Sequence, residues 1–233
     1  YDQFVDLNDC LGIVIATRPD CINDEIIEYL SELNNKTDLY IELGLQTIHD
    51  STADIINRCY EYKVFLKAIR MLFKANIKVT VHIINGLPNE DKDMMIETVK
   101  QLSFLPIFGV KFHCLNVLRD TTLEKIYKQI NLKLLTKDEY FDILSNQLLY
   151  LRNDIVIERI NTDAKRSDLI GPNWNNKKVT ISNDLDKLLE KNDLYQGKLV
   201  RKNQPYINFA HNLVKTINKY DVAVDCTLGN GYD

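Results

Sequence analysis

The sequence predicts an α/β fold, organised as a partial (β/α) TIM-like barrel with parallel strands. Short β-branched segments such as 77–84 alternate with segments such as 62–75, whose apolar residues recur at helical spacing. Roughly 35 residues separate successive strands, which is the length that a helical crossover between parallel strands needs. With 233 residues, of which 45% are hydrophobic, the chain can bury a substantial core.

The first two-thirds of the chain contain four predicted strands, each followed by a loop and by one or two helices. The strands are expected at residues 11–16, 39–43, 77–84 and 110–117. The helices are expected at residues 23–34, 51–58, 62–75 and 91–102, and the loops of most interest at 44–47 and 85–90.

The alternation changes after Arg119. The later elements are expected to be helices at 123–130 and 137–151, a strand at 155–160, a polar segment at 161–174 and a helix at 182–192. The sequence LYQGKL at 194–199 then indicates a boundary, beyond which a helix at 205–218 and a strand at 222–224 are expected. The sequence therefore predicts two domains, residues 1–200 and residues 201–233.

Polar residues follow each of the first four strands. In parallel βα arrangements the ligand site lies at the C-terminal ends of the strands, so these residues are candidates to line a site. They are Thr17, Arg18, Gln46, His49, Asn85, Glu90, Asn116 and Arg119. His82 and His113 lie inside apolar strands, and we expect hydrogen-bonded histidines of the core or barrel lining there rather than acid–base catalysts.

Composition excludes some classes of protein and leaves others open. No apolar run approaches the roughly 18 to 20 residues of a membrane span, so no membrane partner is expected. The five cysteines are scattered, and no two have the spacing of a metal-binding pair. We therefore expect reduced thiols in a cytoplasmic protein and no metal site formed by these cysteines. Residues 1–110 carry 10 Lys/Arg against 17 Asp/Glu, and residues 111–233 carry 19 against 16. The basic later half could suit a phosphate-rich partner, although so small a difference is more often just solvated surface.

Three loop sequences together resemble the radical S-adenosylmethionine (SAM) superfamily, and within it a bacterial family with TRPDC and ELGLQ signatures. They are ATRPDCI at 16–22, ELGLQTIHDSTADIINR at 42–58 and HIINGLPNED at 82–91. The later sequences INTDAKRSDLIGPNW and LYQGKL also resemble that family. The resemblance implies a partial barrel that binds SAM beside a 4Fe-4S cluster. The cluster, reduced by a donor such as flavodoxin or ferredoxin, cleaves SAM to a 5′-deoxyadenosyl radical.

The resemblance also implies roles for single residues. Gln46 and Arg58 would bind the methionine or ribose part of SAM, and an Arg fork suits a carboxylate. Ile84, Gly86 and Glu90 match a glycine–isoleucine–glycine–glutamate pattern on the adenine side, in which His82 replaces the first glycine. Arg18 and Cys21 are the catalytic candidates, and for Cys21 a buried structural thiol is the competing interpretation.

The cluster cysteines of that family have no counterpart in this sequence. They are expected upstream of Tyr1, so we expect this chain alone to contain no stoichiometric iron. The first residue is not Met and the last ten residues stop within a motif, so an internal piece of a longer protein is expected.

The end of the chain resembles a different family, the class I methyltransferases with an FAH helix and a DATxGNGxD turn. Phe209 to His211 match the helix, and the sequence VDCTLGNGYD at 224–233 matches the turn, with Tyr232 at a position usually held by His. By this resemblance Asp225, Gly229 and Gly231 would bind SAM. The expected fold is thus a radical SAM barrel followed by the first helix and strand of a Rossmann-like methyltransferase.

Both resemblances imply modification of the wobble uridine of tRNA. The radical enzyme would remodel a carboxymethylaminomethyl side chain, and the methyltransferase would methylate the resulting amine, with tRNA as the partner. Two alternatives stay open: a non-catalytic or truncated RNA-binding remnant, and a phosphate-binding barrel enzyme without redox chemistry. Retained SAM affinity would separate the enzyme from the remnant.

Overall fold

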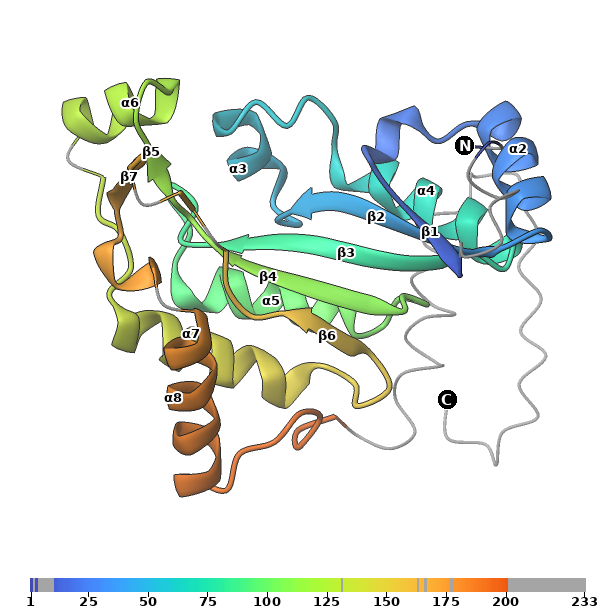
Figure 1. Ribbon diagram of the computed structural model, residues 1–233. Helices are drawn as coiled ribbons and strands as arrows, with labels where there is room; N and C mark the ends of the chain where they lie inside the picture. Colours follow the sequence, from blue (N-terminus) through green and yellow to red (C-terminus); the bar gives the residue numbers. More distant parts are fainter. Residues whose placement is uncertain are drawn as a thin grey trace, which may run out of the picture.

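A computed structural model describes Tyr1, Gln3 and residues 11–200, except residues 131, 163, 166 and 177. Its centre is a five-stranded, fully parallel sheet with the strand order β1-β2-β3-β4-β6 (Figure 1). The strands are β1 (Gly12–Thr17), β2 (Asp38–Gln46), β3 (Lys78–Asn85), β4 (Gly109–Cys114) and β6 (Val156–Arg159). Because spatial order follows sequence order, every crossover steps to the next strand in the same direction, as in a (β/α) barrel.

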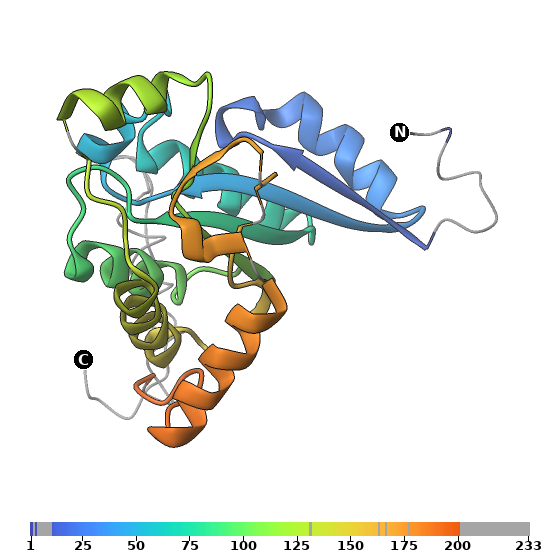
Figure 2. The same ribbon diagram turned by 60° about the vertical axis from the view of Figure 1, so that its left-hand side comes forward.

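The helices connect these strands. They are α2 (Asp24–Asn34), α3 (Asp50–Ile55), α4 (Tyr62–Lys74), α5 (Lys92–Leu102), α6 (Thr122–Ile130), α7 (Lys137–Tyr150) and α8 (Lys178–Lys191). Two short 3-10 helices occur as well, η1 (Pro19–Cys21) and η2 (Asn173–Asn176). Figure 2 shows α7 and α8 side by side at one end of the molecule.

Polar side chains fix where the helices begin. The side chains of Asn23 and Asp91 accept hydrogen bonds from the backbone N–H groups of Ile26 and Met94, which lie three residues further along the chain. They therefore cap α2 and α5. Thr136 and Glu139 form a reciprocal capping box at the start of α7.

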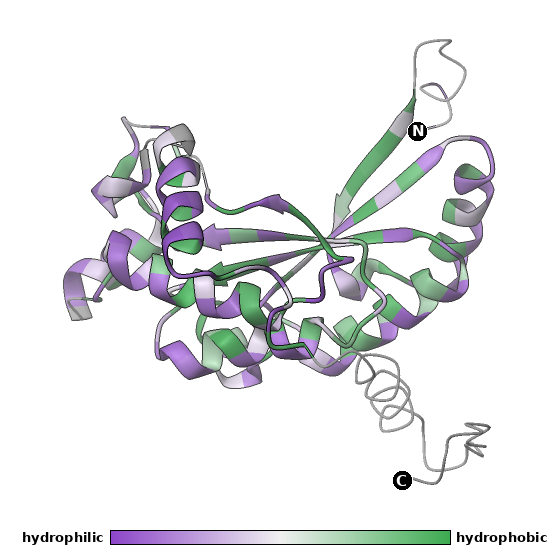
Figure 3. Ribbon diagram, turned by 90° about the horizontal axis from the view of Figure 1, so that it is seen from below, coloured by the Kyte–Doolittle hydropathy of each residue, from purple (hydrophilic) through white to green (hydrophobic). Residues whose placement is uncertain are grey.

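One face of the sheet carries the hydrophobic core. Along β2 the residues Leu39, Ile41, Leu43 and Leu45 are almost wholly buried, and they pack in one cluster with apolar residues of α2, α4, α5 and α7. The intervening β2 residues, from Tyr40 to Gln46, are half-buried on the other face, which we call the inner face. Figure 3 shows the alternation of hydrophobic and hydrophilic residues along the strands. This period of two places every second side chain on the inner face.

Several sequence-based expectations need correction. The expected loop 44–47 is in large part strand, because β2 continues to Gln46 through a register shift against β3. The expected strand 110–117 is divided: β4 ends at Cys114, and β5 (Val117–Leu118) pairs antiparallel with β7 (Leu169–Gly171) in a second sheet. Strand β7 lies in the segment 161–174, which we expected to be irregular and polar. Too short to show an alternation, it gave no periodic signal.

Two helix boundaries also differ. Helix α3 ends at Ile55, so Arg58 follows the helix instead of lying in it. Helix α8 begins at Lys178, ahead of the expected residue 182. The expected helix 205–218, strand 222–224 and domain 201–233 lie outside the described residues.

No helix among the described residues combines the length and the hydropathy that crossing a bilayer requires.

Candidate functional site

A cavity of about 720 Å³ lies at the C-terminal ends of β1, β2 and β3. This volume is within the range of small-molecule sites, which is roughly 300 to 1,000 Å³. Four of the residues singled out in the sequence line it together: Arg18, Gln46, Arg58 and Ile84. The wall is otherwise mainly apolar and includes Ile55, Ile56, Leu87, Leu115, Leu123 and Ile126. The structure therefore joins residues that are up to 66 positions apart in the sequence, from Arg18 to Ile84.

The end of β2 is shaped so that Gln46 turns back over the strand. Gln46 has a left-handed backbone with φ of 64°, at the point where the register with β3 shifts. A Cβ atom on Gly44 would stand 2.6 Å from the Gln46 side-chain amide nitrogen. Only glycine at position 44 leaves this place to the Gln46 amide.

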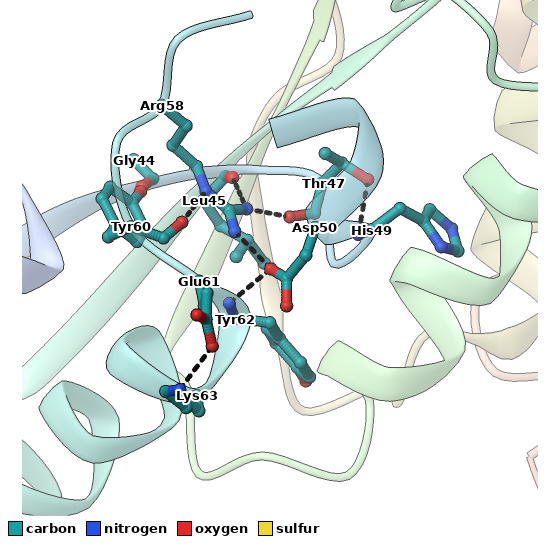
Figure 4. A network of polar contacts seen from close by, with 10 residues as sticks. All are labelled: Gly44, Leu45, Thr47, His49, Asp50, Arg58, Tyr60, Glu61, Tyr62 and Lys63. Carbon is teal, nitrogen blue, oxygen red and sulfur yellow. Dashed lines mark hydrogen bonds and ion pairs between the residues drawn. The ribbon is translucent and has the colours of Figure 1, made fainter. Parts of the chain in front are cut away.

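Arg58 holds the β2–α3 connection together (Figure 4). Its side chain is 2% exposed, and its Nε donates to the Tyr60 carbonyl at 2.9 Å. One terminal nitrogen donates to the carbonyls of Leu45 and Thr47, and the other donates to Asp50 Oδ1 at 3.0 Å. Four of the five N–H groups of the guanidinium thus have protein acceptors. This arrangement indicates a residue that positions the Gln46 turn. The remaining N–H group has no acceptor among the described residues and is available to a ligand.

Tyr60 lies between the two arginines of the cavity. Arg58 and Arg18 approach its ring centroid at 4.6 and 5.7 Å, and its hydroxyl donates to the Gly44 carbonyl. Burial raises the pKa of Tyr60 to about 12. The Arg18 side chain is half exposed, 52%, and is paired with Asp20 at 2.6 Å, so it lies at the rim of the cavity.

Gly86 and Glu90 line a neighbouring cavity of about 370 Å³, together with Met95 of α5. Burial raises the pKa of Glu90, while the hydroxyls of Thr47 and Thr52 partly oppose that rise. Its Oε1 has no hydrogen-bond partner among the described residues. Glu90 is therefore a half-buried residue with a buried carboxyl oxygen, and it faces the β2–α3 connection from the β3 side.

The side chains of other candidates from the sequence form hydrogen bonds with other residues of the protein. His49 Nε2 contacts the Met94 carbonyl at 3.0 Å, and Asn85 pairs with the buried Gln147 at 2.8 Å. Asn116 accepts from Asn175 at 2.7 Å, and Arg119 donates to the Ser167 carbonyl at 3.1 Å. Cys21 is exposed on η1, and the residues that line the cavity do not include it. The structure thus brings Arg18 but not Cys21 to the cavity.

A polar network on the inner face was only partly visible in the sequence. His82 Nε2 contacts Glu42 Oε2 at 2.8 Å, and Lys111 pairs with Glu42 and, at 3.4 Å, with Glu158. His113 Nε2 lies 3.1 Å from His82 Nδ1, which confirms the expected hydrogen-bonded histidines. Glu42, Lys111 and Glu158 were missed, although each lies at an alternate position of a strand. An alternation of charged with aliphatic residues was the signal that could have found them.

Burial and charge set the protonation of this network. Burial lowers the pKa of His82, and it lowers the pKa of His113 to about 4. Burial alone would raise the pKa of Glu42, but hydrogen bonds from Lys111 and His82 lower it overall. Near neutral pH the network therefore holds two neutral imidazoles beside an ionised carboxylate.

The described residues do not fit a metal or an iron–sulfur cluster. Among them, no three His, Cys, Asp or Glu side chains are grouped so that they could hold a metal ion. Of the three cysteines in this part of the chain, Cys21 and Cys59 are exposed and Cys114 is buried, without a shared site.

Two family models match the sequence. The model of the radical SAM superfamily matches residues 9–102, and that of the radical SAM C-terminal domain matches residues 107–191. Among curated proteins, the chain is 40% identical over 202 residues to the Uncharacterized protein YtqA of Bacillus subtilis, covering 87% of this chain and 63% of that protein. It is 25% identical over 164 residues to the tRNA uridine(34) acetyltransferase of Methanocaldococcus jannaschii, covering 69% of this chain and 30% of that protein.

The fold is also that of a solved structure, the archaeal Methanocaldococcus infernus Elp3 with an N-terminal deletion (1-46). The TM-score is 0.72 at 22% identity, over 80% of this chain and 43% of that one. The chain spans less than two-thirds of the length of YtqA. The two family models together cover most of the described residues. The chain therefore belongs to the radical SAM superfamily.

Proposed function

We propose that this chain is the central part of a radical SAM enzyme that remodels the carboxymethylaminomethyl side chain of the tRNA wobble uridine. The observation that carries the SAM site is the cavity that gathers Arg18, Gln46, Arg58 and Ile84 at the strand ends. The tRNA substrate is supported by the relative whose name is tRNA uridine(34) acetyltransferase. The basic later half of the sequence agrees with a polyanionic partner.

SAM fits the residues of the cavity by chemistry. It has a charged amino-acid end, a ribose and a flat adenine, and the cavity offers both polar side chains and aliphatic walls. Gln46 and Arg18 would bind the polar part, and Ile84 would contact the adenine. Gly86 and Glu90 would shape the adenine side from the neighbouring cavity, and Arg58 would hold the Gln46 turn while offering its remaining N–H group. When bound beside a reduced cluster, SAM supplies a radical that abstracts hydrogen from substrate.

The 4Fe-4S cluster would be held by cysteines of a part of the protein that precedes Tyr1, and flavodoxin or ferredoxin would reduce it. The relatives are longer than this chain, which leaves room for such a part. Iron analysis of this chain after anaerobic reconstitution checks the assignment. We expect less than one iron per chain, and about four irons per chain would overturn it.

A methyltransferase would follow the radical domain. Residues 1–200 would form the radical SAM domain and residues 201–233 the start of the second, with Asp225, Gly229 and Gly231 at its SAM loop. The catalytic candidates remain Arg18, which lies at the rim of the cavity, and Cys21, which is exposed outside it. The enzyme would work in the cytoplasm, where tRNA is modified and thiols are reduced.

The experiment is a nucleoside profile of tRNA from cells that lack the full-length gene. We expect the carboxymethylaminomethyl uridine to accumulate and its product to disappear. The full-length gene should restore the product, and the gene with Gln46→Ala should not. Unchanged wobble uridines in the deletion strain would refute the proposed substrate.

The alternative is a non-catalytic RNA-binding remnant, which the lack of a cluster site among the described residues favours. A remnant has no need of SAM. Measurable SAM affinity of the full-length protein that depends on Gln46 would exclude this alternative.

A further inference from the structure

A continuous chain of hydrogen bonds crosses the inner face of the sheet. It runs from Glu42 on β2 to His82 on β3 at 2.8 Å, and from His82 to His113 on β4 at 3.1 Å. It ends at Thr162, just after β6, whose hydroxyl lies 2.8 Å from His113 Nδ1. The two imidazole rings are stacked, with centroids 5.1 Å apart and planes inclined by 21°. Four side chains from four parts of the chain thus form one line.

The direction of the hydrogen bonds follows from the acceptors. An ionised carboxylate only accepts, so His82 Nε2–H donates to Glu42. A neutral imidazole has one N–H group, so His82 Nδ1 accepts from His113 Nε2–H. His113 Nδ1 then has a free lone pair and accepts from the Thr162 hydroxyl. Every hydrogen bond points toward Glu42.

The surrounding charges keep this arrangement. Lys111 of β4 lies between Glu42 and Glu158, and the Thr80 hydroxyl of β3 donates to Glu158. The positive charges of Lys111 and Arg159 oppose protonation of both His82 and His113, whereas the negative charge of Glu42 favours protonation of both. Because Glu42 contacts His82 and not His113, a proton that enters the line is best held at His82.

The line borders the large cavity. In the sheet, Gly44 is paired with His82, and Ile84 is paired with His113. Gly44 and Ile84 both line the cavity. Thr162 is half-buried, and its oxygen keeps lone pairs that no bond in the line uses.

We propose that Glu42, His82, His113 and Thr162 form a proton-accepting relay that opens at Thr162 Oγ. A substrate N–H or O–H group gives its proton to Thr162 Oγ while the threonine proton passes to His113 Nδ1. The Nε2 proton of His113 passes to His82 Nδ1, and the charge stays on His82 beside Glu42. Three protons each move across one hydrogen bond, so the net change is one proton lost by the substrate and one gained by His82, and no electron is exchanged. The relay rests on the proposed function only in that the same barrel would hold the substrate.

The first test needs neither substrate nor cofactor. Nitrogen-15 spectra of histidine-labelled full-length protein report which ring nitrogen carries the proton, and the signals that disappear in His82→Gln and His113→Gln variants identify the two relay histidines. We expect both relay histidines to be neutral and protonated at Nε2 at pH 7. A proton on Nδ1 of either ring, or a doubly protonated ring at pH 7, would overturn the relay.

The second test is kinetic and uses the full-length enzyme with its tRNA. Thr162→Val keeps the shape and removes the hydroxyl, so we expect kcat to fall about a hundredfold with KM changed less than about twofold. Thr162→Ser should restore most of kcat. A Thr162→Val enzyme with kcat within about twofold of the parent would refute the relay. A parent enzyme inactive on tRNA would refute the proposed substrate instead, while the spectra would still decide on the relay.

Discussion

The two faces of strand β2 differ completely although they alternate residue by residue. Leu39, Ile41, Leu43 and Leu45 face the helices and are at most 1% exposed. On the inner face Glu42 forms an ion pair with Lys111. Gly44 leaves space for the side chain of Gln46, which lines the cavity. Stability and chemistry are therefore assigned to opposite faces of the same strand. Substitutions on the two faces should therefore fail in different ways.

The largest expected effect on stability is in the helix-facing core. Leu43→Ala should lower the free energy of unfolding by about 2 to 5 kcal/mol, because Leu43 is fully buried and its loss leaves a cavity. Chemical denaturation measures it. Gln46→Ala, three residues away on the inner face, is the control and should change stability by less than about 1 kcal/mol. Equal losses of stability for the two variants would contradict the assignment of stability to the helix-facing side of β2.

Arg58 is the residue where the two roles meet. Arg58→Ala should cost about 3 kcal/mol of stability, because three backbone carbonyls and Asp50 lose their buried donor. Arg58→Lys should recover only part of it, since an ammonium group cannot reproduce the fork. Lys63→Ala, whose side chain is 74% exposed, is the control and should stay within about 0.5 kcal/mol. An Arg58→Ala protein of parental stability would show that Arg58 serves the ligand alone.

The histidine network predicts how stability depends on pH. The folded pKa of His113 is about 4, below its ordinary value of 6.5, so the unfolded chain takes up the proton first as pH falls. The contribution of His113 to the free energy of unfolding is fully present above pH 6.5. It should be lost from there toward pH 4, by up to about 1.36 kcal/mol per pH unit. His113→Gln should flatten the pH dependence of unfolding between pH 6.5 and 5. An unchanged slope would mean that His113 is protonated in the folded protein.

The smallest effect on stability is expected at Gly44. The Cβ of Gly44→Ala would meet the end of the Gln46 side chain, which can move aside at little cost. Stability should change by less than about 1 kcal/mol, while SAM affinity falls about three- to tenfold because the Gln46 amide is displaced. Parallel denaturation and titration experiments separate the two effects. Unchanged affinity would remove Gln46 from the SAM site.

The alternation of strands and helices was readable from the sequence because each element has one clearly apolar face. Asn23 and Asp91 even marked the helix starts, since their side chains cap them. The end of β2 was not readable: Gly44 and Gln46 look like a turn, but a register shift lets the strand pass through them. Strand β7 was missed because only three residues form it, and its partner β5 is distant in sequence.

The site was predictable in place more than in role. Strand ends located Arg18 and Gln46, the family resemblance located Ile84, and the structure brings all three to one cavity. Arg58 was expected to hold ligand, but its contacts show that most of its donors serve the backbone, which no sequence pattern reveals. The network of Glu42, His82 and Lys111 depends on register between strands, and register is a tertiary property.

The most direct test of the central claim is the SAM affinity of the full-length protein after cluster reconstitution. Gln46→Ala should weaken binding at least about tenfold, a loss of about 1.4 kcal/mol. Gln101→Ala is the matched control, because the Gln101 side chain on α5 contacts Glu97 at 3.4 Å and does not line the cavity, and it should bind SAM like the parent. If Gln46→Ala and Gln101→Ala bind SAM equally well, the cavity at the strand ends is not the SAM site.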